Sequence, residues 1–465
     1  MGIEPLGIFV AAIGIVSVFL GYRSAAIIFM TLAVLGAAAT LIVGSSSIPP
    51  AHLFILFLAA ATLSHRREAG LALRAMAFPR PAFWLAGLLL YGAATGLFAP
   101  RLLAGVTQIV PLGISEYNAD GGTVPLGPVS SNLTQAVYLT ADLISFCLLV
   151  AIGSTPKGFV ALVIGLISYA AANIVFGLMD LLGGPVGQDL LGLIRNAQYT
   201  MRENDTVAGV KRVVGSWPEA SAFAGTTLGS LGFCGTMWLC GRFSRWTGIA
   251  FVISLFLIIR STSSTGLFAA PLCLALLYMT AVVRSGANWG SFNSSATLLL
   301  APPIAAICLM MIALDEALTR QITDYVDLLI FSKANSSSGS ERGAWNAYAL
   351  ANFVDSSGLG VGLGTARTSS FVMALLSNVG WPGTFLFVCF MIAAFGPAKH
   401  TPRSFFSDSR MAARNGCFCL LIGSLVAGPT VDLGLPFFIL AALASCRPET
   451  AVDEASARVP SAQGA

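Results

Sequence analysis

The sequence predicts an all-α fold, a polytopic transmembrane helical bundle of about 12–14 spans with a long, partly helical outer loop near residues 315–371. The 465 residues are 56% hydrophobic and only 10% charged, and their mean hydropathy is +0.82. Soluble domains carry about 25% charged residues, so this chain lacks the polar side chains that a water-exposed surface requires. The composition excludes a cytosolic enzyme, a nucleic-acid-binding protein and a disordered chain.

Each long apolar run is interpreted as a helix, because backbone amides in lipid must be satisfied within the segment. The first run follows Glu4 without a basic stretch, and we therefore expect a retained helix rather than a cleaved signal peptide. The shortest runs could be tilted or re-entrant, which leaves the number at about 12–14. The runs are residues 5–20, 25–43, 51–63, 82–98, 134–153, 158–179, 219–240, 246–259, 266–283, 295–314, 372–395, 415–428 and 433–446.

Basic residues in the short loops indicate the orientation. Strict alternation of the spans places six basic loops on one face, which we expect to be the cytoplasm, together with the C-terminus. The other face then receives three long outer loops, 99–133, 180–218 and 315–371. The six basic loops are the segments 65–80 and 399–414 and the turns that carry Arg23, Lys157, Arg242 with Arg245, and Arg284.

Residues 1–446 are expected to form a single transmembrane domain, and the polar tail 447–465 is expected to be disordered. The nine cysteines lie in or at the edges of apolar stretches, which argues against a structural disulfide or a metal site. Within the third outer loop, a second helix is predicted to begin at Ser340 as its N-cap. A first, amphipathic helix is predicted from the spacing of Leu314, Leu318, Ile322, Val326 and Leu329.

Three arginines in the outer loops, Arg212, Arg342 and Arg367, are candidate ligands of an anion with several oxygens. Arginine stays charged at any biological pH and binds pyrophosphate-like groups with two hydrogen bonds at once. The glycine run that contains Gly362 and Gly364 could add backbone N–H donors to such a site. Alternatively, these glycines only allow a tight loop between packed helices.

Glu219 is the most suggestive carboxylate, because it lies at the outer edge of a span. It could accept a proton from a sugar hydroxyl or could pair with Arg212, and Glu341 and Asp355 are competitors for the role of base. Trp345 fits a sugar-stacking platform and an interfacial anchor equally well. Asp142, inside a span, is costly to expose to lipid and is by default functional or paired.

Five stretches carry a family resemblance. They are RVVGSWPEA at 212–220, STSSTG at 261–266 with Arg260 just before it, SERGAWN at 340–346, GVGLGT at 360–365 and GWPG at 380–383. Their order and membrane placement resemble the O-antigen ligase/polymerase superfamily, and the sequence looks most like a Wzy-type polymerase of polysaccharide repeat units.

The resemblance implies glycosyl transfer on the periplasmic side of the bacterial inner membrane. A glycan built on undecaprenyl pyrophosphate is moved to an acceptor, either the next lipid-linked repeat unit in a polymerase or lipid A core in a ligase. Membrane lipids and a chain-length regulator are further expected partners, with no cofactor, no metal and no nucleic acid. We expect Glu219 and Arg342 to be catalytic, and the substrate-binding residues to be Arg212, Arg367, Arg260, Trp345, Gly362 and Gly364.

Two departures bear on the acceptor and on the base. Ligases carry a histidine eleven positions before the closing Gly-x-x-Gly, where this sequence has Ser369, so a polymerase is favoured over a ligase. An asparagine of the family's second motif is replaced by Glu219, which leaves the assignment of the base open. A third alternative, a transporter or lipid-linked sugar flippase, would place charges near the bilayer midplane and often shows two similar halves.

Overall fold

The computed structural model of the chain is 73% helical and contains 17 helices among its described residues, which confirms the all-α prediction. Six of these helices are long and apolar enough to cross a membrane, so the chain is a helical membrane protein. They are α5 (Pro81–Leu102), α6 (Ser131–Gly153), α7 (Pro156–Leu182), α11 (Ser264–Gly286), α12 (Phe292–Leu314) and α16 (Phe371–Phe395). The structure describes residues 2–43, 46–117, 122–198, 201, 205–207, 209–286, 290–327, 337–396 and 403–448.

Seven further helices correspond to the remaining apolar runs, so every predicted run overlaps a helix. Two of them have only 11 residues, which at about 1.5 Å per residue gives about 16 Å, too short to cross a hydrocarbon core of about 30 Å alone. The seven are α1 (Pro5–Leu20), α2 (Tyr22–Leu32), α3 (Pro50–Leu63), α9 (Ala220–Leu239), α10 (Ser244–Arg260), α17 (Phe405–Val426) and α18 (Leu435–Ser445).

The predicted run 25–43 is wrong as a single span, because α2 ends at Leu32. The chain then turns and enters a three-stranded antiparallel sheet. In the turn that follows, a Cβ on Gly36 would lie 2.3 Å from the ring of Trp217, so this glycine makes room for the indole. The sheet is formed by β1 (Gly2–Ile3), β2 (Leu41–Val43) and β3 (Ser46–Ile48).

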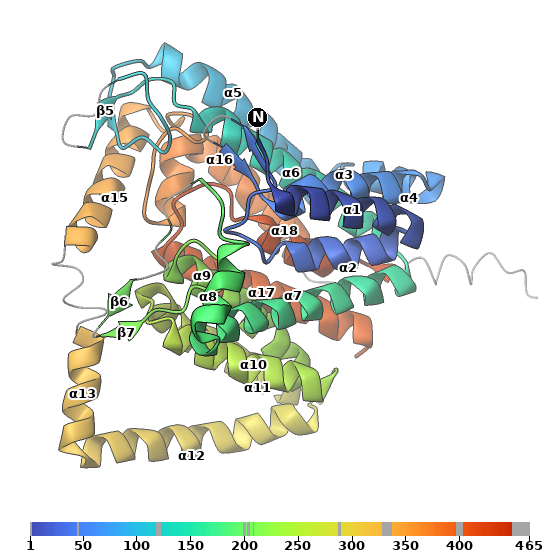
Figure 1. Cartoon of the computed structure of the whole chain (residues 1–465), viewed down its shortest axis with the longest axis vertical. Helices are drawn as coiled ribbons and strands as arrows, with labels where there is room; N and C mark the ends of the chain where they lie inside the picture. The colour runs from blue at the N-terminus through green and yellow to red at the C-terminus, as the bar shows by residue number, and fades with distance from the viewer. Residues whose placement is uncertain are drawn as a thin grey trace, which may run out of the picture.

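The long predicted loops contain short elements that gather at one end of the molecule, on the left of Figure 1, which we call the loop end. The predicted first helix of the third loop is present as α13, although the side chains of Leu318, Ile322 and Val326, and all of Leu329, lie outside the described part. The second begins at Ser337, three residues before the predicted Ser340. These elements are the hairpin β4 (Gln108–Ile109) and β5 (Val124–Pro125), α8 (Gly184–Gly192), the hairpin β6 (Thr206–Val207) and β7 (Val210–Lys211), α13 (Glu316–Val326) and α15 (Ser337–Asp355).

Helix α4 (Arg66–Ala75) lies at the opposite side of the view, on the right of Figure 1, and we call this the basic end. The predicted loop 399–414 is shorter than expected, because α17 already begins at Phe405 with a capping box of Ser404 and Ser407. Most of the predicted disordered tail, from residue 449 on, lies outside the described residues.

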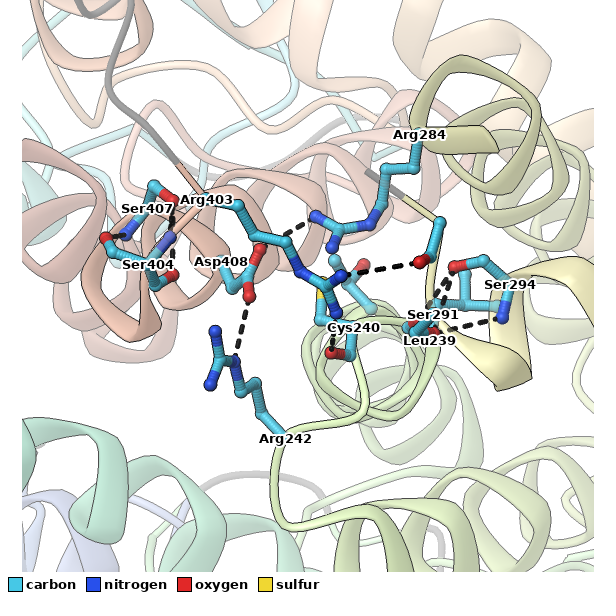
Figure 2. Close-up of polar contacts among 12 residues, drawn as sticks. Leu239, Cys240, Arg242, Arg284, Ser291, Ser294, Arg403, Ser404, Ser407 and Asp408 are labelled. Carbon is cyan, nitrogen blue, oxygen red and sulfur yellow. Dashed lines mark hydrogen bonds and ion pairs between the residues drawn. The ribbon is translucent and has the colours of Figure 1, made fainter. Parts of the chain in front are cut away.

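Asp408 explains why this polar stretch is helical. The buried carboxylate of Asp408 accepts Nε–H of Arg242 at 2.8 Å and Nη1–H of Arg284 at 2.8 Å (Figure 2). Arg403 donates to the carbonyl of Gly290 at 3.3 Å in the same group. These charges, which hydropathy assigns to loops, therefore join α17 to the α9–α10 turn and to α11.

Candidate functional site

The motif at 212–219 is inserted into the helical bundle. The backbone N–H groups of Val214 and Gly215 donate to Oδ2 of Asp180 at 2.7 and 2.9 Å. The hydroxyl of Ser216 donates to the carbonyl of Val34 at 2.7 Å, and Nε1–H of Trp217 donates to Oδ1 of Asn173 at 3.0 Å. The motif is thus fixed against α2 and α7, and it sets where Arg212 and Glu219 lie at its two ends.

Asp180 also accounts for two basic residues, Arg195 and Lys211, of the predicted second outer loop. The expected orientation in the membrane gives no reason for basic residues there. The carboxylate of Asp180 accepts Nη2 of Arg195 at 3.1 Å and Nζ of Lys211 at 3.1 Å, and the side chains of Asp180 and Arg195 are fully buried. Arg195 in turn donates through Nε to the carbonyl of Gly215 at 2.9 Å. Arg195 and Lys211 are therefore anchors of the loop.

Arg212, Arg260 and Glu219 lie around the start of α9 and the turn between α10 and α11. Nε of Arg212 donates to the carbonyl of Ser261 at 3.5 Å, next to Arg260, the last residue of α10. Glu219 is the N-cap of α9, is half-buried, and accepts a hydrogen bond from the hydroxyl of Ser221. The structure therefore brings Arg212 to the STSSTG stretch, as expected if both serve one site.

The turn that follows Arg260 has features that the sequence did not reveal. Thr262 has a φ of +49°, in the left-handed region that a β-branched residue seldom adopts. The buried hydroxyls of Thr262 and Ser263 have no hydrogen-bond partner among the described residues. Strained backbone and unsatisfied buried polar groups concentrate at functional sites, which makes this turn a candidate part of the site.

A second group of candidate residues lies along α15. The guanidinium of Arg367 is stacked over the ring of Trp345, 4.5 Å from its centroid, and its backbone N–H donates to the carbonyl of Val110 at 2.8 Å. Oδ1 of Asn346 accepts the N–H of Ser369 at 3.0 Å, which fixes α15 against the segment of Arg367. Arg342 lies three residues before Trp345 on α15, so the two residues are neighbours on the surface of that helix.

The five predicted charged residues thus form two groups at the loop end. Arg212 contacts the α10–α11 turn next to Arg260, and Glu219 begins α9, whereas Arg367 stacks on Trp345 and Arg342 lies on the same helix as that indole. Figure 1 shows β6, β7 and α15, which adjoin or carry these residues, on the same side of the bundle.

The glycine run favours the tight-loop interpretation over the anion-binding one. The N–H groups of Gly360, Val361 and Gly362 donate to the hydroxyl of Ser356 at 3.0 Å and to the carbonyls of residues 377 and 378 at 2.8 and 3.0 Å. Gly362 and Gly364 have φ values of 107° and 76°. The run packs between α5, α6 and α16, and it fixes the start of the segment that carries Arg367.

Replacing Gly364 with alanine is expected to destabilise the protein by about 2 kcal/mol or more, because a left-handed L-residue costs about 1–2 kcal/mol before any clash. A Cβ there would also lie 2.5 Å from the carbonyl oxygen of Ser131. The matched control is Gly343→Ala, in α15, where nothing lies within 4 Å of a Cβ and alanine should stabilise the helix by about 0.5–1 kcal/mol. Thermal unfolding in detergent measures both, and equal midpoints for the two variants would contradict the packing role.

Asp142 faces a second carboxyl that sequence reasoning missed. Asp432, in the turn between α17 and α18, is close enough to Asp142 for the two groups to interact electrostatically, and burial raises the pKa of Asp432. Tyr138 lies four residues before Asp142 on α6, and its ring centroid is 5.0 Å from that of His52 on α3. An acidic residue between the two apolar runs 415–428 and 433–446 was the available signal for Asp432.

No family model matches this chain, and comparison with curated proteins and with solved structures also finds no match. The fold and its six apolar helices define a helical membrane protein with a polar loop end.

Proposed function

We propose that this protein is a membrane glycosyltransferase that polymerises oligosaccharide repeat units carried on undecaprenyl pyrophosphate. The observation that carries the proposal is the pairing of Arg367 with Trp345, 4.5 Å apart, with Arg342 one helical turn away at the loop end. In this proposal the loop end faces the periplasm, the basic end and the C-terminus face the cytoplasm, and the product is O-antigen or exopolysaccharide.

The proposed reaction breaks the bond between the anomeric carbon of the donor glycan and the pyrophosphate oxygen. A hydroxyl of the acceptor repeat unit attacks that carbon, its proton passes to a carboxylate, and the lipid pyrophosphate leaves with the bonding electron pair. Guanidinium groups stabilise the negative charge that develops on the leaving group, which is electrostatic catalysis by preorganised donors. Trp345 makes a cation–π contact with Arg367, so in this proposal the indole orients the guanidinium that stabilises the leaving pyrophosphate.

Glu219 is the proposed base, because it caps α9 beside the motif that carries Arg212 and is half-buried. Glu219→Gln keeps the shape and removes the proton acceptor, so we expect transfer to slow by about 100-fold or more while donor binding changes little. Initial rates and donor affinity, measured on the purified protein, separate the two effects. Equal losses in rate and in affinity would indicate a structural role.

Glu341→Gln is the matched control, since this carboxylate is exposed on α15 in the other group of candidate residues. We expect it to keep full activity. A large loss of transfer rate in Glu341→Gln, together with normal activity in Glu219→Gln, would identify Glu341 on α15 as the base.

The alternatives differ in their acceptor. A ligase is disfavoured because Ser369 occupies the position of its histidine, and the backbone N–H and carbonyl of Ser369 are used to bind Asn346 and the N–H of Gly428. Incubation of the purified protein with a lipid-linked repeat unit distinguishes the three activities. A ladder of products supports the polymerase, a single transfer that requires lipid A core would identify a ligase, and translocation without any product would identify a flippase.

A further inference from the structure

A large pocket lies at the basic end, opposite the candidate site. It has a volume of about 920 Å³ and lies between α4, the start of α5 and the C-terminal ends of α6, α16 and α18. The proposed glycosyl transfer makes no use of it. Five arginines line it, together with apolar residues; the arginines are Arg66, Arg67, Arg74, Arg80 and Arg447.

The lining of this pocket is strongly basic. The ends of α6, α16 and α18 also line it, and the partial negative charge at a helix C-terminus is small beside that of several guanidinium groups. Glu68, the acidic residue of α4, is buried and accepts the hydroxyl of Tyr22 at 3.2 Å. The lining as a whole therefore favours an anion with several negative charges.

The general excess of basic residues in cytoplasmic loops would explain how many arginines lie at this end. It does not explain why they line the same pocket. Topology is satisfied by basic residues anywhere in the loop, whereas here four from one segment and Arg447 from beyond α18 line a single cavity. Arg67 and Arg74 are two turns apart on α4 and share one face, and both are exposed. Such a cavity is suited to bind a ligand.

Part of the pocket lining is apolar. Phe146 and Val150 of α6 and Ala393 and Ala394 of α16 line it. A soluble anion would gain nothing from contact with apolar side chains. A phospholipid, by contrast, presents phosphates to the arginines and its glycerol and first methylenes to the apolar side chains. The position at the ends of membrane helices also suits a lipid of the adjacent leaflet.

We propose that this pocket binds the head group of an anionic phospholipid, with a preference for one that carries two phosphates. The lipid would bridge α4 and the ends of α6, α16 and α18. The proposal does not depend on the activity of the loop end.

The test compares retention of three probes by the purified full-length protein in detergent, using native mass spectrometry. The probes are tetraoleoyl cardiolipin, phosphatidylcholine and inorganic pyrophosphate. We expect cardiolipin to be retained best and the double variant Arg67→Ala/Arg74→Ala to bind it about 25-fold more weakly, because each basic residue near an anionic head group contributes about a factor of five. Both positions are exposed, so the fold should survive.

The charge-matched control is Arg23→Ala/Arg245→Ala, two exposed arginines of other predicted basic loops that lie outside the pocket lining. It should change cardiolipin retention less than about twofold. Ala393→Phe, which narrows the apolar side and keeps every charge, should also weaken the binding of cardiolipin. Equal losses in both double variants, or displacement of cardiolipin by equimolar pyrophosphate, would overturn the proposal.

Discussion

Replacing Arg342 with alanine is expected to abolish chain lengthening while the protein still reaches the membrane in normal amounts. Loss of one preorganised donor to developing charge reduces turnover by about 100–1,000-fold. Arg342 is half-buried on α15, one turn from the indole that holds Arg367. Arg342→Lys should recover little activity, because an ammonium group is a point charge without the bidentate geometry of a guanidinium.

The control for Arg342→Ala is Arg320→Ala. Arg320 lies in the same outer loop, on α13, where it pairs with Glu316 at 3.1 Å and its side chain is 78% exposed. Such an exposed pair contributes little, so polymer length should stay normal. Polymer is measured by gel electrophoresis of extracted glycan, with protein amounts from membrane fractions. A near-normal polymer length in Arg342→Ala would show that this residue is not part of the catalytic site.

Asp180→Ala is expected to destabilise the protein by about 3–5 kcal/mol, because it removes the carboxylate that pairs with the buried guanidinium of Arg195. The same change leaves the N–H groups of Val214 and Gly215 without their acceptor. Because these bonds fix the segment that carries Arg212 and Glu219, we also expect glycosyl transfer to be lost. Denaturant unfolding in detergent micelles, followed by circular dichroism, measures the first effect.

Asp189→Asn is the matched control for Asp180, since Asp189 is exposed on the nearby α8. It should change the free energy of unfolding by less than about 0.5 kcal/mol. A loss of stability below about 1 kcal/mol in Asp180→Ala would mean that the loop is held by other contacts.

Hydropathy predicted where helices lie because each apolar run must satisfy its own backbone in lipid. It placed the first helix correctly at 5–20 and overextended the second, which ends at Leu32 before a turn that packs against Trp217 from a distant loop. It also assigned Asp408 and Arg410 to a loop. Both residues are buried in α17, since Asp408 is neutralised by arginines from two other elements. Burial of paired charges depends on tertiary contacts that composition does not reveal.

The candidate site was predictable as residue types but not as an arrangement. Arg367 and Trp345 are separated by 22 residues, and their contact depends on the glycine-rich turn and on Asn346. The prediction that the amides of the glycine run bind the anion is less favoured, because the N–H groups of Gly360, Val361 and Gly362 donate hydrogen bonds within the packed turn. Asp180 was missed, although a carboxylate at the end of an apolar run beside a basic loop was a usable signal.

Pyrophosphate binding by the arginines at the loop end is tested by the affinity of the purified protein for a short-chain polyprenyl diphosphate compared with the corresponding monophosphate. We expect tighter binding of the diphosphate, and a loss of at least about tenfold in that affinity for Arg342→Ala/Arg367→Ala with little change for the monophosphate. Equal affinities for the two lipids, or an unchanged diphosphate affinity in the double variant, would contradict the proposed role of the arginines at the loop end.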